Sequence, residues 1–135
     1  MSDKTKIAWT DASWNPTRGC SRISPGCEHC YAERMAARFS GPGLWGEGFA
    51  DSSTGVWTRK VALIPSALDI PLHWRRPRRI FVDSTSDLFH EGLSNEDIAA
   101  VFGVMAACPQ HVFQTLTKRA SRMAEMPVAA LTCII

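Results

Sequence analysis

The fold class is indicated most clearly by residues 80–116, IFVDSTSDLFHEGLSNEDIAAVFGVMAACPQHVFQTL. This stretch opens on Ile80 to Val82, a short β-branched and aromatic run that is typical of a buried strand. Ser94, with an acidic residue three positions later, predicts a helix N-terminus, and apolar residues then recur on one helical face until Pro109 ends the helix. Residues 111–116, HVFQTL, predict a second buried strand.

Helices are predicted on both sides of this stretch. The sequence YAERMAARF, which begins at Tyr31, repeats apolar residues every four positions, and a further helix is expected near Ala120. The order helix, strand, helix, strand, helix is the pattern of a parallel α/β sheet. Ligands bind such sheets at the carboxyl ends of the strands, so we expect a site in the loops 83–90 and 117–119.

Three other segments show weaker patterns. Residues 9–25 are rich in aromatic and turn-forming residues and are expected to be loop, and residues 41–58, with five glycines, are expected to form an irregular loop. Residues 67–74 are compatible with a short helix or with an extended connector broken by Pro71. The basic run at residues 73–79, HWRRPRR, suits phosphate contact, although a solvated connector is the alternative.

Length and composition indicate one folded domain, residues 1–135, because 45% hydrophobic and 21% charged residues are an ordinary globular balance. The chain has no apolar run near the roughly 20 residues that cross a bilayer and no signal-peptide core, so a cytoplasmic location and no membrane partner are expected. The net charge of +2 falls short of a dedicated nucleic-acid binder.

Three of the five cysteines lie close together in the sequence, at Cys20, Cys27 and Cys30. The short C-x-x-C pair can wrap around a metal or a cluster corner, and the longer loop can bring in the third sulfur. Iron–sulfur clusters are held by cysteine thiolates, and three thiolates leave one iron open for a ligand that is not protein.

Two alternatives stay open for these cysteines. They are interpreted either as ordinary buried thiols or as ligands of a structural zinc ion. Zinc normally takes four ligands, and the candidates for the fourth are His29, Cys108 and Cys133.

The segment Asn15 to Arg34, NPTRGCSRISPGCEHCYAER, resembles the cluster loop of radical S-adenosylmethionine (SAM) proteins related to spore photoproduct lyase. These proteins also run Asn-Pro, Arg-Gly-Cys, Gly-Cys and Cys-Tyr-Ala in that order. The spacing departs from theirs, because six residues rather than three separate the first two cysteines, and Arg22 to Pro25 account for the excess.

The chain from Thr5 to about Met126 is also similar to a phage- and prophage-associated family of unknown function, the gp thirty-seven/gp sixty-eight or three-Cys-motif family. The likeness covers KIAWTDASWNP, RRIFVDSTSDLFHE and PQHVFQTLTKRASRM. Members generally continue through additional strands. The resemblance therefore implies a partial radical-SAM-like (β/α) barrel, the N-terminal half only, and we expect the chain to be truncated at its C-terminus.

The resemblance also implies a cofactor site. Cys20, Cys27 and Cys30 would hold a [4Fe–4S] cluster whose open iron binds SAM. The candidate cofactor-binding residues are Ser84, Lys118, Asp87 and Tyr31. Each has a plainer alternative: a helix cap for the aspartate, a solvated charge for the lysine and core packing for the tyrosine.

The resulting hypothesis is an enzyme that cleaves SAM reductively and acts on an unknown substrate, for which nucleic acid is the candidate. A partner protein encoded nearby is a further candidate. The alternatives are a zinc-binding module without enzymatic activity, which binds nucleic acid or a phage partner, and an inactive truncated remnant.

Overall fold

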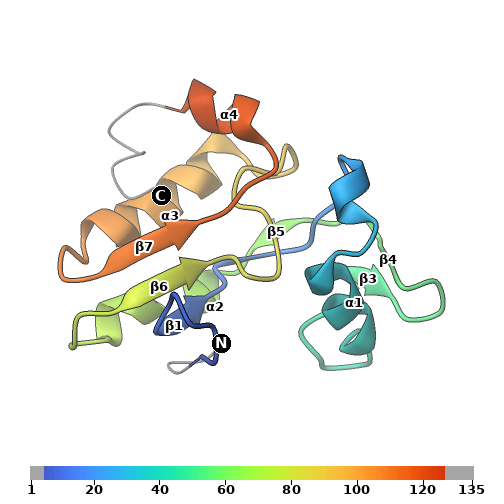
Figure 1. The fold of residues 1–135 in the computed structure, drawn as a ribbon, viewed down its shortest axis with the longest axis horizontal. Helices are drawn as coiled ribbons and strands as arrows, with labels where there is room; N and C mark the ends of the chain where they lie inside the picture. Colours follow the sequence, from blue (N-terminus) through green and yellow to red (C-terminus); the bar gives the residue numbers. More distant parts are fainter. Residues whose placement is uncertain (1–4, 127–135) are drawn as a thin grey trace.

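Three parallel strands form the main sheet of the computed structural model, which describes residues 5–126 (Figure 1). The strands are, in sheet order, β1 (Ala12–Trp14), β6 (Arg79–Val82) and β7 (Val112–Thr115). Ile80 in the central strand lies opposite Ala12 on one side and Phe113 on the other. In Figure 1 the arrows of β6 and β7 point toward the cysteine loop and α1 (Tyr31–Arg38).

The main hydrophobic core lies between one face of this sheet and α3 (Asn95–Ala106). Trp14, Ile80 and Val82 are fully buried on the sheet side, and apolar residues of α3 pack against them. The hydroxyl of Ser94 accepts the backbone N–H of Asp97 at 3.0 Å, which is the N-cap that the sequence predicts. After β7 the chain enters α4 (Ala120–Glu125).

A second, smaller core forms around α1, which lies apart from the main sheet in Figure 1. It joins α1 to the hairpin of β3 (Ala50–Asp51) and β4 (Val56–Trp57). The antiparallel pair β2 (Thr17–Arg18) and β5 (Ala62–Leu63) connects the two cores. The remaining elements are short helical turns: a 3₁₀ turn at Pro25–Cys27, α2 at Pro65–Leu68 and a 3₁₀ turn at Ile70–His73.

The predicted strands at residues 80–82 and 111–116 are confirmed as parallel neighbours, and the helices after Cys30 and Ser94 are confirmed. The prediction of loop for residues 9–25 is wrong at β1 and β2. A three-residue strand is too short for an alternating pattern, and β1 is buried because β6 pairs with it. Residues 41–58 are irregular except for the β3–β4 hairpin, and residues 67–74 are helical turns rather than an extended connector.

The main sheet has two free edges within residues 5–126 and does not close into a barrel there. In the same part of the chain, no helix is both long and apolar enough to span a membrane.

Candidate functional site

Cys20, Cys27 and Cys30 line one cavity of about 300 Å³. Cys27 ends the 3₁₀ turn and Cys30 is the N-cap residue of α1, so the three thiols come from the loop between β2 and α1. The opposite wall comes from the residues that follow β6 and β7: Ser86, Asp87, Leu116, Thr117, Lys118 and Arg119. The structure thus brings the cysteine loop to the carboxyl ends of two parallel strands, where ligands bind in α/β proteins.

Gly19 fixes the backbone immediately before the first cysteine. Its φ of 91° lies in the left-handed region, and a Cβ atom at this position would lie 1.9 Å from the carbonyl oxygen of Lys60. Gly19 also forms a parallel bridge with Ser86 in the loop after β6. Only glycine fits this close approach, which explains the Gly-Cys pair at the start of the motif.

The long segment between Cys20 and Cys27 is anchored to α1. The Arg22 guanidinium donates two hydrogen bonds to Oε1 of Glu33, at 2.6 and 3.0 Å, and one to Oε2 at 3.2 Å. Glu33 is only 2% exposed, and its carboxylate also accepts the backbone N–H of Trp57 at 3.3 Å. Arg22, one of the residues that lengthen the cysteine spacing, therefore holds the loop against α1 and, through Glu33, against β4.

Lys118 contacts Cys27 across the cavity. Its ammonium donates to the carbonyl of Gly26 at 2.8 Å and to the Cys27 sulfur at 3.5 Å. Burial acts to raise the pKa of Cys27, but hydrogen bonds from residues 23–24 and the charge of Lys118 outweigh it and lower the pKa to about 7. A large share of this thiol is therefore thiolate near neutral pH, which is the form that binds metals.

Sequence reasoning placed Arg119 in an expected site loop, residues 117–119, but did not name it as a site residue. Its buried guanidinium donates to the Cys20 sulfur at 3.7 Å, to Asp87 at 3.2 Å and to Glu91 at 2.6 Å. Burial raises the pKa of Cys20, and the charge of Arg119 only partly offsets that rise. The signal in the sequence was its place in that loop, directly after Lys118 and at the carboxyl end of a strand.

Asp87 joins the two strand-end loops. Its carboxylate accepts the hydroxyl of Thr117 at 2.7 Å and the backbone N–H groups of Lys118 and Phe89 at 3.2 and 3.0 Å, in addition to Arg119. Asp87 lines the cavity, but both of its carboxylate oxygens already accept these hydrogen bonds. The carboxylate thereby sets the position of the loop that carries Lys118 and Arg119.

Two of the predicted cofactor-binding residues lie outside this cavity. The backbone N–H and the hydroxyl of Ser84 donate to Oδ1 of Asn15, at 2.9 and 3.1 Å. The Tyr31 side chain is 63% exposed on the first turn of α1. A cofactor role for Ser84 and Tyr31 stays a prediction, while Asp87 and Lys118 lie in the same cavity as the cysteines.

Neither candidate for a fourth thiolate or imidazole ligand within residues 5–126 lines the cavity. Cys108 is buried in the main core, His29 is exposed, and Cys133 lies outside the described residues. In the same part of the chain, no three His, Cys, Asp or Glu side chains form a group that could hold a single metal ion. Both ring nitrogens of His90 are engaged, by the Gly92 N–H and by the Ser21 hydroxyl.

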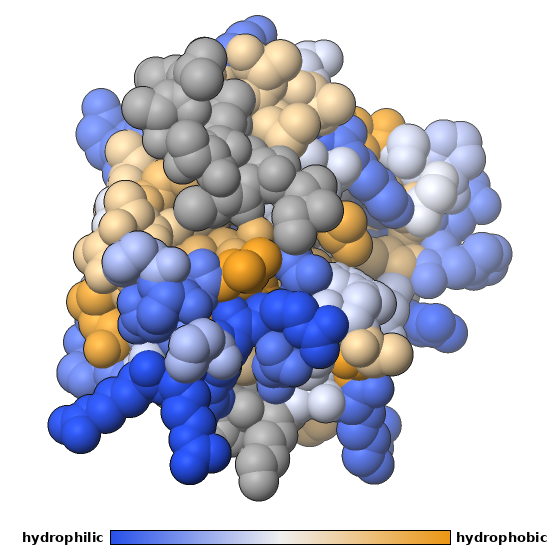
Figure 2. Space-filling model, turned by 60° about the vertical axis from the view of Figure 1, so that its left-hand side comes forward, coloured by the Kyte–Doolittle hydropathy of each residue, from blue (hydrophilic) through white to orange (hydrophobic). Residues whose placement is uncertain are grey.

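The basic run at residues 73–79 lies at the amino end of β6, away from the cysteine cavity. Figure 2 brings this side of the molecule forward and shows strongly hydrophilic side chains gathered in its lower part. Arg79 pairs with Asp11 at 3.0 Å, and the guanidinium of Arg78 lies 5.0 Å from the centroid of the Trp74 ring. Two of the four arginines thus have structural contacts.

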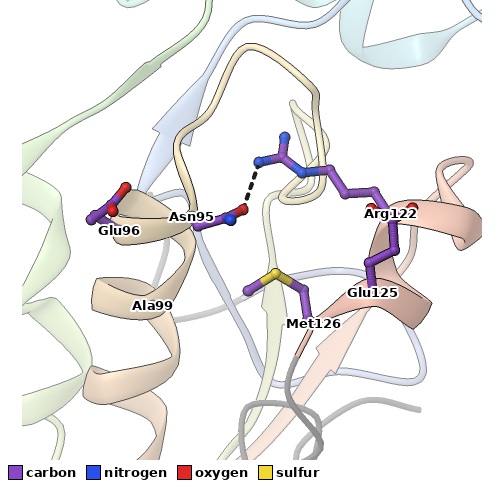
Figure 3. A pocket seen from close by; sticks show the side chains of 6 residues that line it. All are labelled: Asn95, Glu96, Ala99, Arg122, Glu125 and Met126. Carbon is purple, nitrogen blue, oxygen red and sulfur yellow. Dashed lines mark hydrogen bonds between the residues drawn. The ribbon is translucent and has the colours of Figure 1, made fainter.

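A separate hollow lies between α3 and α4 (Figure 3). Arg122 points across it and donates to the side chain of Asn95 at 3.2 Å, and it also donates to the carbonyl oxygens of His90 and Leu93. This arginine joins α4 to the start of α3. No cysteine or histidine lines the hollow, so its described walls offer no thiolate or imidazole ligand.

Comparison with known proteins identifies one family. A family model described as "Protein of unknown function (DUF5131)" matches residues 4–133. No curated protein and no solved structure matches the chain.

Proposed function

The chain belongs to the DUF5131 family of proteins of unknown function, and we propose that it is a radical SAM-like iron–sulfur protein. In this proposal Cys20, Cys27 and Cys30 hold a [4Fe–4S] cluster, and SAM binds in the same cavity. The likeness of the sequence to a phage- and prophage-associated family supports a phage setting. The observation that carries the proposal is the single cavity lined by all three cysteines and by the strand-end residues Asp87 and Lys118.

The donor set suits an anionic cluster. Three thiols converge on the cavity, and the cationic groups of Lys118 and Arg119 each contact a different cysteine sulfur. Opposite charges favour the thiolate form of a cysteine, and hydrogen bonds to ligand sulfurs are a standard feature of iron–sulfur sites. The cavity walls thus supply both the ligands and the compensating charge.

The arrangement supports a cluster better than a zinc ion. Thiolates that bind one zinc at about 2.3 Å must lie within about 4 Å of one another, and a structural site has four ligands. Within residues 5–126, no thiolate or imidazole candidate for a fourth ligand lines the cavity, and no three His, Cys, Asp or Glu side chains are arranged for a single ion. The Asp87 carboxylate does line the cavity, but it already accepts hydrogen bonds from Phe89, Thr117, Lys118 and Arg119. The cysteines that hold a cluster each bind a different iron, so their sulfurs can lie farther apart than around one zinc ion. Three thiols are enough, because the fourth iron can take a ligand that is not protein.

A bound cluster would supply the one-electron reduction by which radical SAM enzymes cleave SAM. The chain's own residues position the partners of that reaction. Lys118 carries the charge that we propose for the SAM carboxylate, and Asp87 holds its loop in place. Leu116 and Trp57 contribute apolar wall to the cavity.

The fold supports the same proposal at a coarser level. The three parallel strands would be part of a radical-SAM-like (β/α) barrel. Val112 and Leu116 are exposed on the sheet or at its end, as expected when a parallel sheet is covered on only one face. Nucleic acid remains the proposed substrate, on the resemblance to a DNA-repair lyase alone.

The experiment is anaerobic purification followed by reconstitution with iron and sulfide. The parent chain is expected to assemble a cluster, Cys27→Ala to lose it and Cys108→Ala to keep it, because Cys27 lines the cavity whereas Cys108 is buried in the main core. Iron and acid-labile sulfide would be quantified for all three. One zinc per chain and no sulfide would support the zinc module instead.

SAM binding is tested separately on the reconstituted chain. Titration of SAM should change the electron paramagnetic resonance signal of the reduced cluster. Lys118→Ala should keep the cluster but weaken SAM binding by about tenfold, because a charge-assisted hydrogen bond is lost. If the parent assembles a cluster whose signal does not change with SAM, the radical SAM assignment is refuted. If Lys118→Ala binds SAM as tightly as the parent does, only the role of Lys118 in SAM binding is refuted.

A further inference from the structure

A second cavity of about 530 Å³ adjoins the cysteine cavity. Trp57 lines both cavities, and the consecutive residues Cys20 and Ser21 each line one of them. The walls of the second cavity also include Arg22, Glu33, Arg59, His90 and Glu91. A molecule bound in the second cavity would therefore lie directly beside the proposed cofactor site.

Most charged groups around this second cavity are already paired. Glu33 is neutralised by Arg22, through Nε and Nη2 of the guanidinium, and Glu91 is paired with Arg119 at 2.6 Å. Among residues 5–126, Nη1 of Arg22 has no hydrogen-bond partner, and the Arg59 guanidinium has neither a hydrogen-bond nor an ion-pair partner. The charged donors left unpaired at this cavity are therefore the guanidinium groups of Arg22 and Arg59.

Arg59 is held in a backbone conformation that favours glycine. Its φ is 71°, and a residue with a Cβ atom pays about 1 kcal/mol or more in this region. The neighbours impose the conformation: the Thr58 hydroxyl donates to the carbonyl of Gly48 at 2.6 Å and accepts the N–H of Lys60 at 3.4 Å. An arginine where glycine would be more stable, with its charge unpaired beside a cavity, indicates a ligand for that charge.

We propose that the second cavity binds a phosphate group of the substrate through Arg59 and the free Nη1 of Arg22. A guanidinium is charged at every physiological pH and presents paired donors that match phosphate oxygens. The Trp57 indole adds an aromatic surface, so a nucleotide is the substrate class that fits. Assigning this phosphate to the substrate rests on the proposed function, whereas the anion site itself does not.

The test uses the full chain without a cluster and measures binding by isothermal titration calorimetry. The probes are thymidine 5′-monophosphate, thymidine and inorganic pyrophosphate. The parent should bind the monophosphate at least tenfold more tightly than the nucleoside. Arg59→Gly should weaken binding of the monophosphate and of pyrophosphate at least tenfold while its midpoint of thermal unfolding stays equal or rises. Arg34→Ala is the matched control, because Arg34 is an exposed arginine that lines neither cavity.

Arg59→Met, which keeps the Cβ atom, is the second variant if the glycine variant does not fold, and it should lose anion binding equally. Failure of the parent to bind either phosphate probe, or equal binding in the parent and Arg59→Gly, would overturn the proposal. Loss of SAM binding in reconstituted Arg59→Gly with unchanged nucleotide binding would also overturn it, since the cavity would then serve the SAM carboxylate. Because the test needs no cluster, failed cluster assembly would sink the proposed function and leave this site intact.

Discussion

Replacing Asp83 with asparagine should remove a pH dependence from the stability of the fold. Asp83 follows β6 and is buried, with its carboxyl group bonded to the N–H and the hydroxyl of Thr17 at 3.2 and 2.8 Å. The Thr17 hydroxyl lies 3.0 Å from the hydroxyl of Ser86, which lines the cysteine cavity. This group therefore ties the strand that leads to the cysteine loop to the opposite wall of the site.

Burial raises the pKa of Asp83 from 3.8 to about 7, although the hydrogen bonds from Thr17 act to lower it. Between these two values the folded chain binds more protons than the unfolded chain, so the free energy of unfolding falls as pH rises. The contribution of Asp83 to the free energy of unfolding is fully present below about pH 4 and is lost by about pH 7. The pKa of Asp83 differs by about three units between the unfolded and the folded chain, which corresponds to a loss of about 4 kcal/mol in the free energy of unfolding across this pH range.

Asparagine suits this position in three respects. Its amide is neutral at every pH in the range, its oxygen can accept the Thr17 N–H, and its NH₂ can donate to the Thr17 hydroxyl, as a protonated Asp83 would. Asparagine also tolerates the φ of 56° recorded for Asp83. Asp83→Asn should therefore be no less stable than the parent at pH 8. As the pH falls toward 4, the parent should become more stable relative to the variant.

Urea unfolding of the cluster-free chain under reducing conditions, followed by circular dichroism from pH 4 to pH 8, measures this difference. Asp11→Asn is the control. Hydrogen bonds from Arg79 lower the pKa of Asp11 to about 2, so its contribution is present above about pH 4 and is lost only as pH falls below that value. A constant gap between the parent and Asp83→Asn across the whole range would refute the reasoning.

Three further predictions concern the cysteine loop and the N-cap of α3. Gly19→Ala should unfold the cysteine loop and prevent iron loading, measured by bound iron, because the added Cβ meets the Lys60 carbonyl at 1.9 Å. Arg22→Met should destabilise the chain more than Glu33→Gln in urea unfolding, since it leaves a buried carboxylate unpaired; the opposite ranking would contradict this account. Ser94→Ala should cost about 1 kcal/mol in the same assay, because α3 loses its N-cap.

Local sequence patterns predicted the elements whose cause is local. The cap at Ser94, the four-residue apolar repeat after Cys30 and the β-branched run at residues 80–82 each gave an element of the expected type. The parallel pairing of β6 with β7 also followed, because a helix between two strands brings the second strand back in the same direction.

The sequence alone identified the three cysteines that line one cavity and the places where the strand-end loops begin. Only the tertiary structure decided how they meet. It made β1 a strand through pairing with β6, and it placed Arg119 between Cys20 and Asp87. The reason is physical: helix caps and apolar periods depend on neighbours a few residues apart, whereas a buried charge finds its partners 32 or 99 residues away only after the core has formed.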